Sequence, residues 1–78
     1  MKSDVIHIDS EILGGTPVFR GTRVPIETLF DHLEEGISLD DFLKDFPTVT
    51  RHQAIEVLEL AGNVLTNKDF KKMYEAAA

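Results

Sequence analysis

The 78-residue sequence contains no cysteine, which excludes a disulfide framework and any metal site built from thiolates. It has no apolar run near the roughly 18 residues that a membrane-spanning helix needs, and residues 1–10 lack a signal-peptide core. Low-complexity segments and internal repeats are also absent. These absences predict one small cytoplasmic domain with a modest core, which association with another chain would help to stabilise.

Positive charge is scarce, because 14 acidic residues outnumber 8 lysines and arginines and leave a net charge of −6. The excess lies in residues 26–50, which carry one lysine against seven acids, whereas residues 1–25 and 51–78 are balanced. Such a chain is a poor general binder of phosphate. Any contact with nucleic acid is therefore expected from a local basic surface, made by Arg20, Arg23 and Arg51.

No group of residues in the sequence has the pattern of a catalytic or metal site. His7, His32 and His52 fall in three separate predicted elements, and no motif links a serine to any of them. The acids between Glu27 and Glu35 spread over a solvent-facing helix surface instead of converging on one point. The segment Gly14-Gly15-Thr16 lacks the lysine of a phosphate-binding loop. We expect no enzyme activity, no catalytic residue, no metal, no cofactor and no small-molecule substrate.

The stretch 38–61 has the pattern of two helices joined by a tight turn. Ser38 is a suitable N-cap for the first helix, and Pro47 ends it because proline lacks the amide hydrogen. Thr50 and Gln53 have the spacing of a capping box at the start of the second helix. The first helix has one apolar stripe, formed by Leu39, Phe42, Leu43 and Phe46.

Short strands are predicted before this stretch, at Val5–Ile8 and Val18–Phe19, on either side of a chain reversal at Gly14-Gly15. Arg20-Gly21-Thr22-Arg23 predicts a tight turn, and a further helix is expected over 25–35. We therefore expect a mainly α fold: a tri-helical helix-turn-helix, homeodomain-like or winged-helix-like, with short N-terminal β-strands.

We expect this helix-turn-helix domain to cover residues 1–65, with its strands paired as a hairpin. Residues 66–78 are interpreted as a C-terminal tail that contains a short helix. The final Ala76-Ala77-Ala78 resembles a cloning scar and is excluded from this fold prediction.

Two apolar lines run along the predicted third helix, over 51–65. One consists of Ala54, Ile55, Leu58, Ala61 and Leu65, and the other of Val57, Leu60 and Val64. A helix of so small a domain seldom buries two stripes in its own core, so the second is predicted to meet another chain, either a twin or a different protein. In the tail, an apolar face of Phe70, Met73 and Tyr74 is expected either to dock on a partner or to pack on its own domain.

The first turn of the third helix supplies the other candidates for DNA contact. Arg51 suits a guanine edge and Gln53 an adenine edge, although the capping box already explains Gln53. The predicted DNA-binding residues are Arg20, Arg23, Arg51, His52 and Gln53. The three acids of the preceding helix, Asp40, Asp41 and Asp45, oppose a phosphate contact there.

The segment from Ile12 to Ile26 contains Gly-Gly-Thr-Pro followed by Arg-Gly-Thr-Arg-Val-Pro. It resembles the sequence pattern of the domain-of-unknown-function family 433 (DUF433). Gly36-Ile37-Ser38 and Phe46-Pro47 extend the resemblance to about residues 4–65. It implies a helix-turn-helix fold and an antitoxin-like protein paired with a PIN-like nuclease toxin. The family has no established catalytic residues to carry over, and Leu13 stands where it often has cysteine.

Two functions follow as hypotheses. The first is an antitoxin of a type II toxin–antitoxin pair, binding a PIN-like nuclease and contacting operator DNA as a homodimer. The alternative is a protein-only interaction module with a helix-turn-helix shape and no DNA binding.

Overall fold

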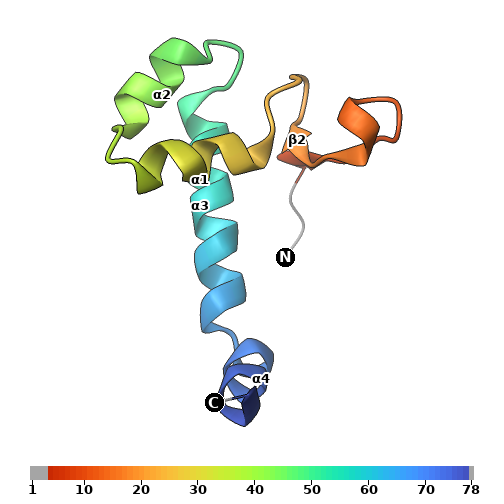
Figure 1. The fold of residues 1–78 in the computed structure, drawn as a ribbon, viewed down its shortest axis with the longest axis vertical. Coiled ribbons are helices and arrows are strands. Elements are labelled where there is room, and N and C mark those ends of the chain that lie inside the picture. Colours follow the sequence, from red (N-terminus) through yellow and green to blue (C-terminus); the bar gives the residue numbers. More distant parts are fainter. Residues whose placement is uncertain (1–3, 78) are drawn as a thin grey trace.

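The computed structural model describes residues 4–77, so residues 1–3 of the predicted domain and Ala78 of the predicted scar lie outside the described residues. The described chain is mainly α, with a small antiparallel strand pair before four helices (Figure 1). The elements are β1 (Ile6–His7), a 3-10 turn η1 (Leu13–Gly15), β2 (Val18–Phe19), α1 (Ile26–Glu34), α2 (Leu39–Asp45), α3 (Arg51–Thr66) and α4 (Lys68–Ala77).

The strand pair is shorter than predicted at its first strand. Ile6 pairs with Phe19 and His7 with Val18 in antiparallel register, which would place Ile8 opposite Pro17. The next amide that could donate to β1 in this register is that of Thr16, which donates instead to the Leu13 carbonyl at 3.3 Å. The ladder therefore ends before this point, and Ile8 is 64% exposed. The predicted reversal is confirmed: Gly14 and Gly15 have φ of 65° and 93°.

The predicted turn at Arg20–Arg23 is confirmed and connects the strands to α1. The Thr22 amide donates to the Phe19 carbonyl at 3.0 Å, while Gly21 has a φ of 80°, which glycine adopts without a side-chain clash. The helix expected at this point begins at Ile26, and Pro25 stands at its N-cap.

The predicted caps of α2 and α3 are also confirmed. The Ser38 hydroxyl accepts from the Asp41 amide at 3.1 Å. At α3, the Thr50 hydroxyl accepts from the Gln53 amide, and the Gln53 side chain accepts in turn from the Thr50 amide at 3.0 Å. Each cap satisfies helix N–H groups that have no partner within the helix, which explains why both helices begin where they do.

The core lies where α1, α2 and the first half of α3 meet the strand pair. The Phe42 ring is fully buried and packs against Phe19, His32 and Phe46, with ring centroids 6.2, 5.4 and 5.1 Å away. The buried hydrophobic residues are Val5, Val18, Phe19, Leu29, Phe42, Val49, Ala54 and Val57.

The two apolar lines predicted on α3 do not divide as expected. Val57, assigned to the exposed line, is 3% exposed and belongs to the core, whereas Ile55, assigned to the buried line, is 41% exposed. The helix is therefore rotated relative to the prediction, with Ala54 and Val57 facing inward. Leu60 packs partly against the core, and Val64 is exposed. Val57 is therefore not available for contact with a second chain, whereas Leu60 and Val64 remain accessible.

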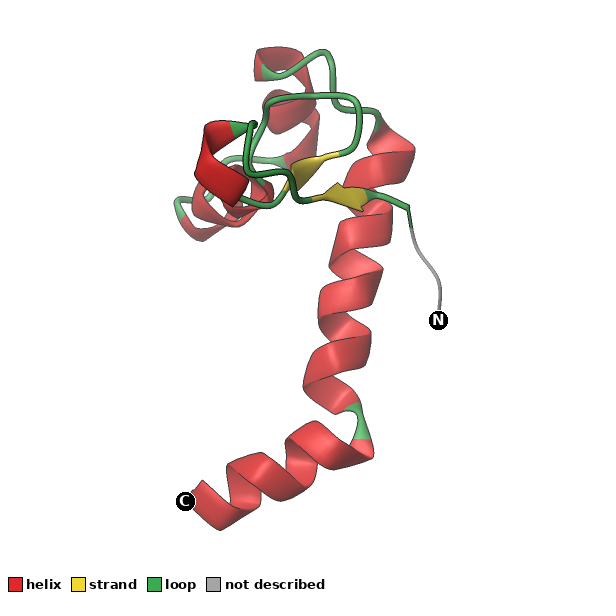
Figure 2. Cartoon of the chain, turned by 90° about the vertical axis from the view of Figure 1, so that its right-hand side faces the viewer, coloured by secondary structure: helices red, strands yellow, loops and turns green. Residues whose placement is uncertain are grey.

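The C-terminal half of α3 and the whole of α4 project from the head of the molecule as an arm (Figure 2). The radius of gyration is 14.0 Å, whereas a compact domain of this length has about 11.5 Å. The predicted short tail helix is confirmed as α4, but it includes Ala76 and Ala77, which had been excluded as a scar. The side chain of Asn67 caps α4 by accepting from the Phe70 amide at 2.7 Å.

Candidate functional site

Arg20 lies on the predicted basic surface, but its guanidinium is already bonded within the chain. Its Nε donates to the Asp4 carbonyl, one Nη donates to the Ile6 carbonyl at 3.2 Å, and the other lies 3.2 Å from His7 Nδ1. These contacts hold β1 against the turn that follows β2. These hydrogen bonds explain the arginine at position 20 without any contact to a phosphate group.

Gln53 is also occupied at both ends of its side-chain amide. Its oxygen accepts from the Thr50 amide, and its Nε2 donates to the Arg20 carbonyl at 2.9 Å. Reading an adenine edge needs both the oxygen and the nitrogen of this amide. Such a contact would therefore break the capping box and the link between α3 and the Arg20–Arg23 turn.

The structure brings the predicted DNA-binding residues to one end of the molecule, where the Arg20–Arg23 turn meets the start of α3. Arg51 forms an ion pair with Asp40 of α2, and His52 lies 3.5 Å from Glu56. Arg23 forms no hydrogen bond or ion pair within residues 4–77. Within this group, Arg23 is therefore the arginine that is available to bind an anion without first breaking a contact in the described part of the chain.

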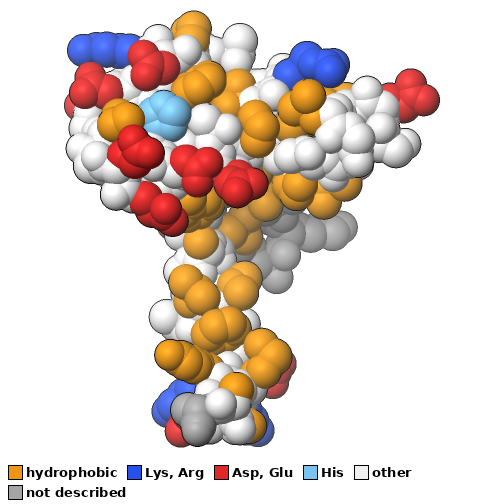
Figure 3. Space-filling view, in the orientation of Figure 1, with side chains coloured by type: hydrophobic (Ala, Val, Ile, Leu, Met, Phe, Trp, Pro, Cys, Tyr) orange, Lys and Arg blue, Asp and Glu red, His pale blue; other side chains and the backbone are white. Residues whose placement is uncertain are grey.

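Acidic side chains gather on the head over α1 and α2 (Figure 3). This acidic face consists of Glu27, Asp31, Glu34, Glu35, Asp40, Asp41 and Asp45, all of them exposed. Its local cations are Lys44, which lies 4.0 Å from Asp41, and Arg51. Within the described part of the chain, no three histidine or acidic side chains converge as metal ligands. The face therefore presents negative charge without a metal-binding geometry.

A shallow, open groove of about 350 Å³ lies beside α3, between the strand pair, α1 and the arm. We call it the α1–α3 groove; its walls are Ile6, Ile26, Phe30, Val57, Leu60, Ala61, Val64 and Leu65. The predicted partner residues Leu60 and Val64 lie in it. The sequence did not identify Ile6, Ile26 and Phe30 as wall residues, because they belong to two predicted elements, the first strand and the first helix, that are separate from α3 in the chain.

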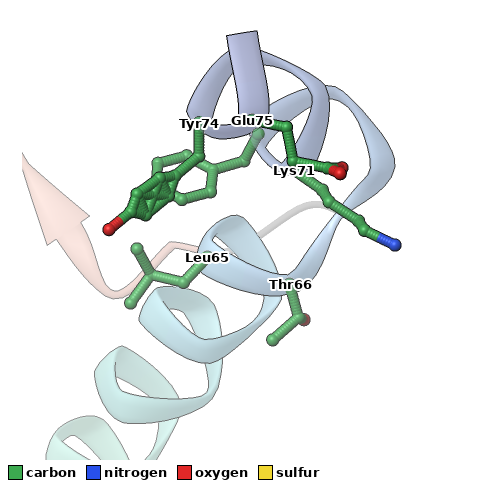
Figure 4. Close-up of a pocket in the computed structure, with 6 residues that line it drawn as sticks. Leu65, Thr66, Lys71, Tyr74 and Glu75 are labelled. Atoms are coloured by element: carbon green, nitrogen blue, oxygen red, sulfur yellow. The ribbon is translucent and has the colours of Figure 1, made fainter. Parts of the chain in front are cut away.

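A second hollow of about 380 Å³ lies where α4 meets the end of α3 (Figure 4). Leu65 lies opposite the Tyr74 ring across it (Figure 4), and Thr66, Phe70, Lys71 and Glu75 complete its lining. Met73 and Tyr74, both predicted to bind a partner, are 63% and 62% exposed, and Phe70 is half-buried. Leu65 borders this hollow and the α1–α3 groove, so the two apolar surfaces are continuous.

Gln53→Ala is expected to lower the free energy of unfolding by about 1–2 kcal/mol, because it removes half of the capping box and the bond to the Arg20 carbonyl. Urea denaturation followed by circular dichroism measures the change. The matched control is His52→Ala at the neighbouring exposed position, with an expected change within about 0.5 kcal/mol. Equal losses in the two variants would contradict the structural role of Gln53.

Three comparisons with known proteins add to this geometry. A family model described as "Protein of unknown function (DUF433)" matches residues 6–61. An uncharacterized protein, y4eO of Sinorhizobium fredii (strain NBRC 101917 / NGR234), is 37% identical over 46 residues, which are 59% of this chain and 21% of that protein. The chain thus spans about a fifth of that relative. No solved structure matches. In the described part of the chain, no helix has both the length and the apolar character to span a membrane.

Proposed function

We propose that this chain, which belongs to the DUF433 family, is a non-enzymatic, antitoxin-like protein that acts in the cytoplasm. In this proposal it binds a PIN-like nuclease, as a dimer. The nuclease partner is what the resemblance of the Ile12–Ile26 segment implies. The structural observation that supports nuclease binding by this chain is the acidic face on α1 and α2.

The acidic face suits a partner that itself binds RNA. Seven exposed carboxylates lie on two adjacent helices, and Lys44 and Arg51 offset only part of their charge. A nuclease must attract the phosphates of its substrate, so the surface around its active site is basic. A negatively charged protein surface is complementary to such a site and accelerates the encounter. An acidic face that covers the RNA-binding surface would inhibit the nuclease.

A specific observation also favours the alternative, a protein-only interaction module. We assign α1, α2 and α3 to a tri-helical helix-turn-helix, whose recognition residues would be Arg51, His52 and Gln53. Gln53 is bonded at both ends and Arg51 is paired with Asp40. Both side chains would have to leave their partners to contact base edges. Within the antitoxin proposal, operator binding is therefore the part with less support.

Neutralising the acidic face is expected to slow binding of the nuclease. The test variant carries Asp31→Asn, Glu35→Gln and Asp41→Asn, and the purified product of an adjacent nuclease gene is the ligand. The association rate should fall about tenfold at low salt, because electrostatic steering acts mainly on the rate of encounter. Stopped-flow or surface plasmon resonance at two salt concentrations measures it.

The matched control removes three exposed acids elsewhere, by Glu11→Gln, Glu59→Gln and Glu75→Gln. It removes the same number of negative charges and should keep most of the wild-type rate. Equal slowing in both variants would show that net charge matters and the acidic face does not. No binding of the wild-type chain to the nuclease would end the antitoxin proposal.

Titration of labelled promoter DNA separates the two candidate functions. A repressor should bind at about 50 mM salt and lose affinity steeply towards about 200 mM, as its phosphate contacts are screened. Arg23→Ala should weaken that binding. The absence of binding at the lower salt concentration would remove operator binding from the proposal and leave protein binding as the function, whether or not the partner is a nuclease.

A further inference from the structure

We infer that two copies of this chain exchange their α4 helices, each seating α4 in the α1–α3 groove of the other. The inference rests on the proposed dimer and specifies how it is built. The surfaces involved are separate from the proposed nuclease contact, except for Glu27 and Glu34, which belong to the acidic face and also border the groove.

The groove is an apolar surface that residues 4–77 leave open. Ile6, Ile26 and Phe30 form one wall and are only partly buried, while Val64 on the other wall is 54% exposed. These side chains come from three elements and meet along the side of α3. Contiguous apolar surface of this kind on a small domain commonly marks an interaction site.

The α4 helix has the matching shape and composition. Phe70, Met73 and Tyr74 share one side of it, at the i, i+3, i+4 spacing, and the last two are largely exposed. At 10 residues, the helix is about 15 Å long. An amphipathic helix with anchors at this spacing is the usual ligand of an apolar groove.

The connection between α3 and α4 keeps α4 from the groove of its own chain. Asn67 alone separates the two helices. Antiparallel helix pairs are joined by about 2–5 residues. With a single residue, α4 cannot reverse direction and lie back along the side of α3 that carries Leu60 and Val64. The α4 helix that fills the groove must therefore come from another copy.

Charge at the edges of the two surfaces favours the same pairing. Lys71 borders the apolar side of α4, beside Leu65 and Tyr74. Glu27 and Glu34 border the groove, since they line the adjoining hollow with Ile26 and Phe30. An α4 helix seated with Lys71 towards α1 therefore meets opposite charge at the rim.

The apolar surface runs without interruption from the α1–α3 groove over Leu65 to α4. When two copies are related by a two-fold axis, the groove of each copy faces the α4 helix of the other. The groove end of this surface has an acidic rim, and its α4 end presents an apolar side with Lys71 and Glu75 at the edge. Leu65 lies between the two ends. Two such surfaces placed antiparallel fill both grooves at once. The result is a closed two-fold dimer with no surface left to recruit a third copy.

Charge reversal on the two surfaces tests this exchange. One variant carries Lys71→Glu and a second carries Glu27→Lys and Glu34→Lys. Each alone should dimerise about tenfold more weakly, because the like-charge contact occurs twice in the two-fold dimer. An equimolar mixture should regain near-wild-type affinity, because both exchanged contacts of the mixed dimer again pair opposite charges. Analytical ultracentrifugation measures the dissociation constants.

Lys72→Glu is the matched control, because its position lies on the opposite side of α4 from Phe70, and it should dimerise like wild type. A wild-type chain that stays monomeric at high concentration would overturn the inference. So would a mixture no tighter than its components. A monomeric chain would also remove the dimer from the proposed function, but neither result decides whether the chain binds the nuclease, which is measured with a different ligand.

Cross-linking identifies the occupant of the groove directly. The chain has no cysteine, so the Phe30→Cys variant and the Met73→Cys variant each carry a single reactive thiol. Mixing the two single variants with a short bismaleimide should give a covalent heterodimer. A compact cross-linked monomer from the double variant would instead place α4 in its own groove. A homodimer from Met73→Cys alone, with no heterodimer, would indicate side-by-side arms; both results refute the exchange.

Discussion

Val57→Asp is expected to unfold the domain. Val57 is 3% exposed and packs in the core with Phe19, Leu29 and Phe42. Within residues 4–77 the core holds no buried polar or charged residue that could pair with a new carboxylate. Burying an unpaired charge costs more than about 4 kcal/mol. A domain of this size has only about 4–12 kcal/mol of stability to lose.

Val64→Asp is the matched control, with the same substitution two turns further along α3. Val64 is 54% exposed, so the new carboxylate stays hydrated and the chain should remain folded. It should dimerise more weakly, because Val64 lines the α1–α3 groove. Circular dichroism on heating measures folding, and light scattering measures mass. A cooperative, wild-type melting transition for Val57→Asp would show that the core is arranged differently.

Phe42→Ala is expected to lower the free energy of unfolding by about 3–5 kcal/mol. The ring is fully buried, and it is the contact shared by Phe19, His32 and Phe46. Its removal takes away the apolar area of the side chain and leaves a cavity between α1 and α2, which rigid neighbours fill only partly. Urea denaturation followed by circular dichroism gives the change in midpoint.

Tyr74→Ala provides the comparison for this loss. Tyr74 is 62% exposed on α4, so its removal should change the stability of the monomer by less than about 0.5 kcal/mol. Both variants are measured below the concentration at which the chain dimerises. A loss for Phe42→Ala no larger than that for Tyr74→Ala would contradict its central place in the core.

The helix boundaries and turns were predictable because they depend on neighbouring residues. Ser38 reaches the Asp41 amide within one helical turn, and the Thr50–Gln53 capping box is equally local. Gly21 and Gly36 have positive φ because the local backbone turns there. These preferences act over a few residues, so they are present in the sequence whatever the rest of the chain does.

The direction that each helix faces was not predictable in the same way. The apolar lines of α3 are adjacent, and a helix can be turned to bury either one. The position of α1 and the strand pair selected the side with Val57, and Ile55 was left partly in solvent. The second bond of Gln53 has the same origin, because it reaches the Arg20 carbonyl 33 positions away in the sequence.

The sequence alone therefore determined the helices, their caps, the glycine turns and the acidic character of residues 26–50. The tertiary structure decided which of the candidate binding residues remain available. It placed Val57 in the core, tied Arg20 and Gln53 into the fold, and built the α1–α3 groove from Ile6, Ile26 and Val64. The physical reason is that caps and turns depend on short-range backbone preferences, whereas burial and grooves depend on which distant segments pack together.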